Sequence, residues 1–451
     1  MAVETAAPKK DKTVYENLEL IRPELDRCMK CGNCMAVCPI YGTDKVEGGV
    51  ARAKVAVTEA ILAGKLELGD PQVYELLFNC LICKSCMMNC PTKVNFDKIM
   101  LAVRAAIVRE KGLPWLKKMI FGMLKNPKLF DAGMKFGAAM QGIAFRDYDS
   151  KDQKLMAPRT PFTWVGGSVG LDSSKVLPEL AVKTFRDSIP DVITAANPKT
   201  KAAFFTGCSI NYFYPETGND IVDVLKENQV EVHIPKDQYC CGLPVFAHGD
   251  VETARKLAKN NIDAIDKTGA EYIVVGCGSC GGCLMHDYKE LLGNDPVYGP
   301  KVEYWSKRVH EISTFLVNVL KYRKPTGTLD PVTVTYHDSC HLKKTMKVFN
   351  EPREIIKNVP GVTLKEMAKP DACCGMGGTY ILTHYETGAE IGKRKAADMN
   401  STGADMITTG CPGCAMQLLD LSHRHGKGKP VKHYVSLLAE SYRKEKSKQL
   451  W

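Results

Sequence analysis

The sequence of 451 residues lacks the features of a membrane-spanning or secreted protein. No uncharged apolar run approaches the roughly 18 residues that a helix needs to cross a bilayer. Charged side chains interrupt even the most apolar segment, residues 115–145. The first twelve residues, MAVETAAPKKDK, are polar and of mixed charge, so they do not form a secretory signal. We therefore expect a cytoplasmic protein.

The sequence also lacks the patterns that bind dinucleotides or nucleic acids. The glycine cluster GGSVG at residues 166–170 has the wrong spacing for a dinucleotide fold. We expect a loop there, and no flavin or nicotinamide on this chain. The formal net charge of +10 counts every cysteine as neutral, and thiolates bound to a metal would lower it. Basic residues are scattered and not striped with aromatic residues, so no nucleic-acid partner is expected.

Cysteine, by contrast, is abundant, with 19 residues. Disulfides are rare in a reducing compartment, where clustered cysteines are more often metal ligands. Adjacent cysteines precede a glycine in QYCCGLP (residues 238–244) and again in DACCGMG (residues 371–377). Such a pair could be a reactive dithiol, a disulfide or two ligands, and the spacing of the other cysteines favours ligands.

The first hundred residues contain the motif C-x2-C-x2-C-x3-C-P twice, at residues 28–39 and 80–91. This is the pattern of bacterial two-cluster ferredoxins, in which three cysteines of one motif and the fourth cysteine of the other hold each [4Fe–4S] cube. Zinc sites also use C-x2-C, but zinc needs only four ligands, which the repeated motif exceeds. The predicted ligands are Cys28, Cys31, Cys34 and Cys90 for one cluster, and Cys80, Cys83, Cys86 and Cys38 for the other.

The segment between these motifs predicts helices. Apolar residues from Ala53 to Ile61 recur at helical spacing, and those from Val73 to Leu77 indicate a second helix. We therefore predict an α-helical ferredoxin domain over residues 1–105 with two cubane clusters. A cube held by four thiolates has no open iron, so its expected role is the transfer of single electrons.

Residues 106–198 contain no cysteine and several prolines. The segment 113–145 has a helical, amphipathic pattern. Such a stripe could face a membrane surface, which would make the protein peripheral to the inner face of the cytoplasmic membrane. More often it packs on a neighbouring domain or subunit. We predict a helical connector and docking region.

The second half of the chain repeats internally. AFFTGCS at residues 203–209 aligns with TVTYHDSC at 333–340. The matching cysteines are separated by 132, 133 and 134 residues at three successive landmarks, which indicates two copies of one domain. Strand and helix patterns alternate in each copy. We therefore predict two α/β units with parallel strands, a first copy over residues 199–326 and a second copy over residues 327–451.

Each copy has five cysteines, one more than a cube needs. Neighbouring cysteines in an extended segment point to opposite sides, so Cys240 and Cys241 can share a compact cluster only if the backbone bends. Gly242 and Gly375 could supply this bend. Five ligands imply a larger or distorted cluster with an iron position that could open to a substrate. The predicted ligands are Cys208, Cys240, Cys241, Cys277 and Cys280 in the first copy, and Cys340, Cys373, Cys374, Cys411 and Cys414 in the second.

The arrangement C-x31-C-C-x35-C-x2-C, repeated with one more residue in each long gap, resembles the cysteine-rich CCG domain of heterodisulfide reductases. It is similar to the iron–sulfur subunits of glycolate oxidase, D-lactate dehydrogenase and anaerobic glycerol-3-phosphate dehydrogenase. The resemblance extends from Cys28 to about Tyr434, and implies a non-cubane [4Fe–4S] cluster on each complete motif. Many glycolate-oxidase-type subunits lack cysteines in one copy, whereas this chain keeps all ten. Phrases such as YHDSCHLKK (residues 336–344) resemble the glycolate and lactate subunits.

The resemblance implies an α+β multidomain subunit of an oxidoreductase complex and leaves two functions open. In the first, an FAD-binding partner oxidises a 2-hydroxy acid such as lactate or glycolate, and this chain relays the electrons to a quinone, cytochrome or other acceptor. In the second, the chain is a catalytic heterodisulfide-reductase-like subunit fed by a membrane cytochrome or another electron-transfer protein. The catalytic residues are unknown from sequence. A zinc-stabilised scaffold without redox function does not account for the cysteine spacing.

Four further residues lie near the predicted ligands. Cys283 has Gln417 as its counterpart in the second copy, so we expect a buried thiol. His286, His337 and His341 could tune or protonate a cluster, although hydrogen-bonded loop histidines are more common.

Overall fold

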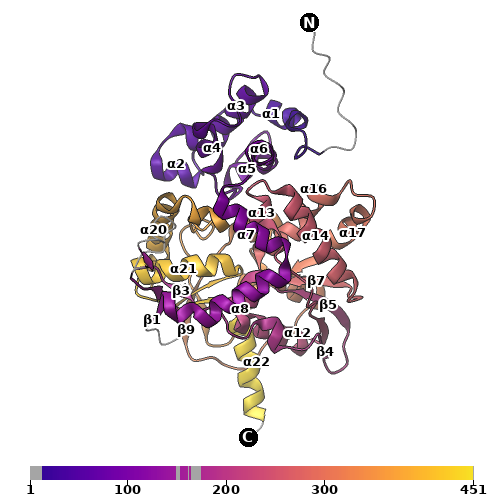
Figure 1. The fold of residues 1–451 in the computed structure, drawn as a ribbon. Helices are drawn as coiled ribbons and strands as arrows, with labels where there is room; N and C mark the ends of the chain where they lie inside the picture. The colour runs from indigo at the N-terminus through magenta and orange to yellow at the C-terminus, as the bar shows by residue number, and fades with distance from the viewer. Residues whose placement is uncertain (1–12, 149–152, 161, 164–173, 450–451) are drawn as a thin grey trace.

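The computed structural model describes residues 13–148, 153–160, 162–163 and 174–449. A helical module at the N-terminus sits above two α/β units that lie side by side (Figure 1). Within the described residues, no helix is both long and apolar enough to span a bilayer. The predicted loop at 166–170 lies outside the described residues.

The N-terminal module is helical, as its sequence pattern predicts. Its longest helix, Phe96–Lys111, is buried along most of its length, and the other helices of the module pack around it. The two helices predicted between the motifs are present as α3 (Ala51–Leu62) and α4 (Pro71–Phe78). Asp70 caps the N-terminus of α4, where its side chain accepts hydrogen bonds from the Gln72 and Val73 amides. The helices are α1 (Arg22–Asp26), α2 (Pro39–Asp44), α3 (Ala51–Leu62), α4 (Pro71–Phe78), α5 (Ser85–Met88) and α6 (Phe96–Lys111), with short 3-10 turns at Leu18–Ile21 and Glu47–Gly49.

The first part of the connector is helical. Two successive helices, α7 (Trp115–Lys125) and α8 (Pro127–Ala144), cross the front of the two α/β units (Figure 1). After it comes a small antiparallel sheet, which the sequence pattern did not predict. Its strands are β1 (Phe145–Tyr148), β2 (Leu155–Pro158) and β3 (Leu177–Pro178).

The first copy is a five-stranded sheet in the order β4-β6-β5-β7-β8. All neighbouring pairs are parallel except β4 with β6. The strands are β4 (Val192–Ile193), β5 (Thr200–Phe205), β6 (Val230–His233), β7 (Tyr272–Val275) and β8 (Val309–Glu311). The helices and helical turns are α10 (Phe185–Ser188), α11 (Gly207–Tyr212), α12 (Pro215–Glu227), α13 (Leu243–Phe246), α14 (Val251–Asp266), α15 (Gly278–Gly282), α16 (Tyr288–Leu292), α17 (Tyr298–Ser306) and α18 (Ile312–Thr314), with π-helical turns at Cys283–Asp287 and Phe315–Leu320.

The second copy is a four-stranded, fully parallel sheet in the order β10-β9-β11-β12. Apolar side chains of α12 and of the C-terminal helix share one core, which joins the two copies. The predicted fold class, a helical dicluster domain followed by two α/β units, is therefore confirmed. The elements are β9 (Val332–His337), β10 (Val362–Leu364), β11 (Met406–Thr409), β12 (Val431–His433), α19 (Glu351–Asn358), α20 (Tyr385–Ser401), α21 (Pro412–His425) and α22 (Val435–Gln449), with a π-helical turn at His341–Met346 and a 3-10 turn at Gly378–Leu382.

Candidate cluster sites

The two motifs of the N-terminal module cross over to form two small cavities. The outer four-cysteine site is a cavity of about 40 Å³ lined by Cys28, Cys31, Cys34 and Cys90. The inner four-cysteine site is a cavity of about 30 Å³ lined by Cys38, Cys80, Cys83 and Cys86. These are the two groupings that the ferredoxin pattern predicts. Cys86 lines both cavities.

Both motifs bend the chain in the same way around their second cysteine. Lys30 and Ile82, which precede it, have φ of 56° and 49°, and Gly32 and Lys84, which follow it, have φ of 85° and 61°. Left-handed backbone is unfavourable for a β-branched residue such as Ile82. The bend directs backbone amides at sulfur, since the Ile82 amide lies 3.5 Å from the Cys80 Sγ. Backbone strain of this kind is typical of functional sites, where the surrounding structure holds it in place.

The ten cysteines of the two copies line a single cavity of about 210 Å³, which we call the central cavity. Most of them lie just after parallel strands, at the carboxyl ends of both sheets, where ligand sites of open α/β sheets form. The first five-cysteine site comprises the predicted ligands of the first copy, and the second five-cysteine site those of the second. The two sites meet at Cys277 and Cys411, whose Sγ atoms are 3.9 Å apart.

The cysteine pairs bend as the sequence predicts. Gly242 and Gly375 have φ of 89° and 87°, in the left-handed region that favours glycine. In both copies the glycine amide lies close to the sulfur two residues before it, at 3.5 Å from Cys240 Sγ and 3.4 Å from Cys373 Sγ. A Cβ on Gly375 would lie 2.2 Å from the Gly388 carbonyl oxygen, so only glycine fits.

The inner four-cysteine site adjoins the central cavity. Cys83 lines both, and Cys340 and Cys373 pack against the same small apolar cluster as Cys83. The four sites therefore form a continuous series in which each neighbouring pair shares a cysteine or a direct contact. All 19 cysteines are free thiols in the structure.

The chemistry of these cavities fits iron–sulfur clusters. Burial raises the pKa of the Cys38 thiol to about 11 and that of Cys340 to about 12, so these groups become thiolates only when a metal replaces the proton. Soft thiolates in groups of four and five are the donor set of iron–sulfur clusters. Cubes held by four thiolates supply one-electron transfer when bound.

Two buried cations lie beside the inner four-cysteine site, and sequence patterns gave no sign of them. Lys54 is 1% exposed and donates to the Leu76 carbonyl and to the Asn79 carbonyl, the latter at 3.0 Å. Arg104 is 3% exposed and donates to the Cys80 carbonyl at 2.9 Å and to three other carbonyls. Burial lowers the pKa of Lys54 and that of Arg104. Neither forms an ion pair with a carboxylate among the described residues, so the negative charge of a thiolate cluster is their natural counterpart.

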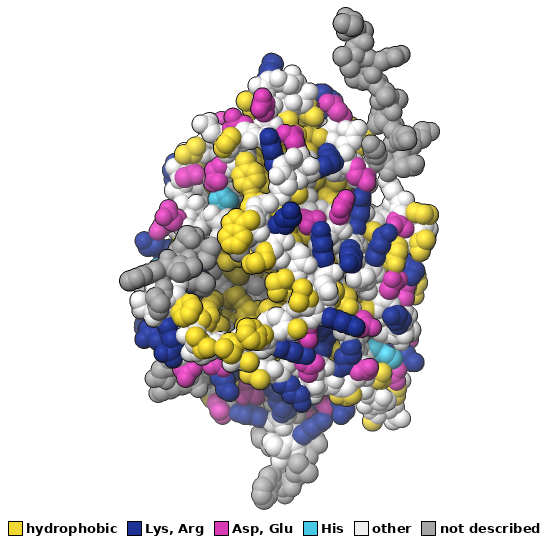
Figure 2. All heavy atoms as spheres, viewed as in Figure 1, with side chains coloured by type: hydrophobic (Ala, Val, Ile, Leu, Met, Phe, Trp, Pro, Cys, Tyr) yellow, Lys and Arg dark blue, Asp and Glu magenta, His cyan; other side chains and the backbone are white. Residues whose placement is uncertain are grey.

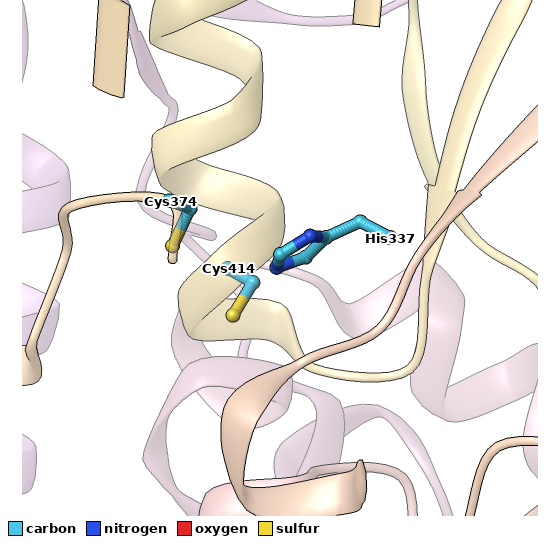
Figure 3. Close-up of side chains that lie close together, drawn as sticks. All are labelled: His337, Cys374 and Cys414. Carbon is cyan, nitrogen blue, oxygen red and sulfur yellow. The ribbon is translucent and has the colours of Figure 1, made fainter. Parts of the chain in front are cut away.

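The three histidines differ in their positions. His337 lies against the second five-cysteine site, with a ring nitrogen and the sulfurs of Cys374 and Cys414 all within 4.8 Å of one another (Figure 3). His341 also lines the central cavity, with Nδ1 3.6 Å from Cys340 Sγ, and burial lowers its pKa to about 4. His286 is not among the residues that line this cavity.

Cys283 is a buried thiol, in agreement with the sequence. It is fully buried, its Sγ donates to the Cys241 carbonyl at 3.3 Å, and it is not among the residues lining the central cavity. Charged residues that sequence reasoning missed do line it. Lys84 and Asp97 form an ion pair of 2.7 Å there, and burial raises the pKa of Asp287 to about 7.

Comparisons with known proteins agree with this architecture. Residues 24–94 match a 4Fe-4S dicluster domain, and residues 202–285 and 334–419 match the cysteine-rich CCG domain. The dicluster match implies two cubane clusters, and the CCG cysteines indicate further ones.

Three relatives are informative. The probable glycolate oxidase iron–sulfur subunit of Bacillus subtilis is 29% identical over 430 residues, which cover 93% of this chain and 94% of the relative. Lactate utilization protein A of Shouchella clausii is 33% identical over 236 residues, covering 52% of this chain and 97% of the relative. A fumarate reductase (CoM/CoB) subunit of Methanothermobacter marburgensis is 28% identical over 436 residues, covering 94% of this chain and 75% of the relative. The chain therefore belongs to the family of glycolate oxidase iron–sulfur subunits and lactate utilization A proteins, with a helical dicluster domain followed by two CCG domains.

Proposed function

We propose that this chain is the electron-transfer subunit of a complex that oxidises a 2-hydroxy acid such as lactate or glycolate. The observation that carries this proposal is the continuous series of cysteine-lined cavities. Cys86 joins the outer to the inner four-cysteine site, Cys83 joins the inner site to the central cavity, and Cys277 contacts Cys411 within it. Such a series suits a relay of single electrons across the whole molecule.

In this proposal the eight cysteines of the N-terminal module bind two cubane clusters, and each five-cysteine site binds one non-cubane [4Fe–4S] cluster. The chain itself would bind no flavin. An FAD-binding dehydrogenase subunit would take two electrons from the hydroxy acid and pass them on singly, and a quinone, cytochrome or other acceptor would receive them.

The outer face of the α7–α8 hairpin is the proposed docking surface for the flavoprotein. Hydrophobic side chains gather around a hollow on this face (Figure 2), and Trp115, Phe136 and Ile143 are 76%, 68% and 58% exposed. Along α8 the exposed positions 129, 132, 136, 139 and 143 follow the 3-4 spacing of a seam that receives another helix. Exposed Lys118, Lys125 and Lys128 complement a partner helix with acidic flanks.

The inner face of the same hairpin covers the first five-cysteine site. Leu124 and Phe130 line a small cavity together with Cys208 and Cys240. A partner on the outer face would thus lie about one helix diameter, roughly 10–12 Å, from that site.

A second candidate function is reduction of a disulfide by two successive one-electron steps at the central cavity. Its supporting observation is that both copies keep all five cysteines around one cavity. One relative is named as a fumarate reductase (CoM/CoB) subunit, so relatives of this chain serve in more than one kind of redox complex.

Anaerobic purification tests the proposal. The chain is expected to carry roughly sixteen irons if all four sites hold [4Fe–4S] units, and to co-purify with an FAD-containing subunit. About half that iron would exclude the two non-cubane clusters. Co-purification with a cytochrome and no flavoprotein, together with disulfide reduction, would favour the second function.

A further inference from the structure

The two five-cysteine sites differ at the residue that ends the strand beside each C-x2-C motif. In the first copy β5 ends at Phe205, which pairs with Val275, two residues before Cys277. In the second copy β9 ends at His337, which pairs with Thr409, two residues before Cys411. The two residues are thus equivalent in register, and an imidazole in one site replaces a phenyl ring in the other.

The imidazole of His337 is held with one nitrogen toward the cysteines. Its Nδ1 lies 3.1 Å from the Pro370 carbonyl oxygen, which can only accept, so Nδ1 carries the hydrogen. In the neutral ring Nε2 therefore presents a lone pair. His337 is 1% exposed, and Nε2 has no hydrogen-bond partner among the described residues. Figure 3 shows the ring directed from the end of β9 toward Cys414 and Cys374.

Packing alone does not require an imidazole here. Phe205 is 1% exposed, so the equivalent place in the first copy accepts an apolar ring. A buried nitrogen without a hydrogen-bond partner costs free energy. A group that binds Nε2 would remove this cost, and the second five-cysteine site is the neighbour it faces.

We propose that His337 binds iron of the second five-cysteine site through Nε2, so that the two CCG copies hold chemically different centres. Metal-binding histidines commonly donate their other N–H to a backbone carbonyl, as Nδ1 of His337 does to Pro370. A hydrogen bond from Nε2 to a cluster sulfur would instead need a doubly protonated ring. The inference rests on the proposed iron sites and is independent of the partner and the substrate.

A neutral nitrogen ligand changes the reduction potential of an iron–sulfur centre. Histidine ligands raise the reduction potential of iron–sulfur centres in which they replace thiolates. We therefore expect the two five-cysteine sites to differ in reduction potential.

The test is pulsed electron paramagnetic resonance on the full, iron-loaded chain, with natural and ¹⁵N-labelled histidine, poised at a series of potentials. Three variants take each residue to its counterpart in the other copy: His337→Phe, His341→Ser (Ser209 is its counterpart) and Phe205→His. We expect a strong histidine nitrogen coupling on one CCG centre in the wild type and in His341→Ser. It should be absent in His337→Phe, and a second coupling should appear in Phe205→His.

Several results would overturn the assignment. They are a wild type with sixteen irons and no strong nitrogen coupling, a coupling that survives in His337→Phe, or one that disappears in His341→Ser. If His337→Phe loses iron, the nitrogen coupling in the labelled wild type and in His341→Ser still tests whether a histidine other than His341 binds the cluster. A wild type with about eight irons would instead remove the two non-cubane clusters on which the inference rests, and would leave the two cubane clusters of the proposed relay.

Discussion

The Sγ atoms of Cys277 and Cys411 lie 3.9 Å apart, although 134 residues separate them in the chain. Each begins the helical turn of its own C-x2-C motif, at the end of β7 or β11. The two five-cysteine sites are therefore in direct contact at one pair of cysteines, and we expect a change at one site to alter the other.

Replacing Cys411 with serine should disturb both five-cysteine sites. We expect loss of iron from the second site and a shifted resonance signal from the first, because Cys277 loses its sulfur neighbour. Iron analysis and electron paramagnetic resonance check this. Cys283→Ser is the matched control, since this buried thiol contacts the Cys241 carbonyl and does not line the cavity. It should keep its full iron content. An unchanged first-site signal in Cys411→Ser would contradict the direct contact.

Replacing Lys54 with methionine should lower the reduction potential of the inner four-cysteine cluster. Its buried ammonium donates to the Asn79 carbonyl, next to Cys80, and stabilises the added electron. The expected fall is on the order of 60 mV, which is a tenfold shift in a one-electron equilibrium. A redox titration measures it. Lys30→Met, which removes an exposed lysine paired with Glu59, should leave this potential nearly unchanged. Equal potentials in wild type and Lys54→Met would refute the effect.

The sequence predicted the grouping of the cysteines more completely than their surroundings. Cysteine spacing is a local property, so the crosswise pairing of Cys38 and Cys90 and the bends at Gly242 and Gly375 could be expected before the structure was known. Lys54 sits in a helix whose pattern does not tell a buried lysine from a solvated one, because the negative charge expected to offset it would belong to a bound cluster. The antiparallel sheet β1–β3 was missed because its strands are only two to four residues long and β2 is buried at every position, so none of them shows a clear alternating pattern.

Glu311 should make the stability of the protein depend on pH. It is fully buried at the end of β8, where its carboxyl group accepts from the Ser313 amide at 2.8 Å and from the Tyr434 hydroxyl of the second copy. Burial raises its pKa to about 7, above the value of about 4.3 in an unfolded chain. The raised pKa contributes stability that is complete below the unfolded value and is lost as the pH rises through about 7.

The expected loss is on the order of 3 kcal/mol between about pH 4.5 and pH 7.5. Denaturant midpoints measured across the upper part of this range, under anaerobic conditions, should fall in the wild type. The fall should be much smaller in Glu311→Gln, which keeps the acceptor oxygen without the charge. Substitution of the exposed Glu252 serves as the control and should not flatten the curve. A wild-type profile that rises with pH would contradict the sign.

Replacing Phe136 with glutamate should release the flavoprotein. The side chain is 68% exposed at the centre of the α8 seam, and a carboxylate there would be buried without a partner in the complex. We expect loss of flavin from the purified complex with iron content unchanged. Val297→Glu, at an apolar residue 62% exposed on the first copy, is the matched control and should keep the flavin. Retention of flavin in Phe136→Glu would place the partner elsewhere.

The most direct test of the account is reduction of the chain by its proposed substrate. The tagged chain is purified anaerobically with its co-purifying flavoprotein, and D-lactate or glycolate is added while visible absorption and electron paramagnetic resonance are recorded. We expect all four centres to accept electrons from the hydroxy acid, and only when the flavoprotein is present. Centres that dithionite reduces but neither hydroxy acid reduces, with the flavoprotein bound, would contradict it.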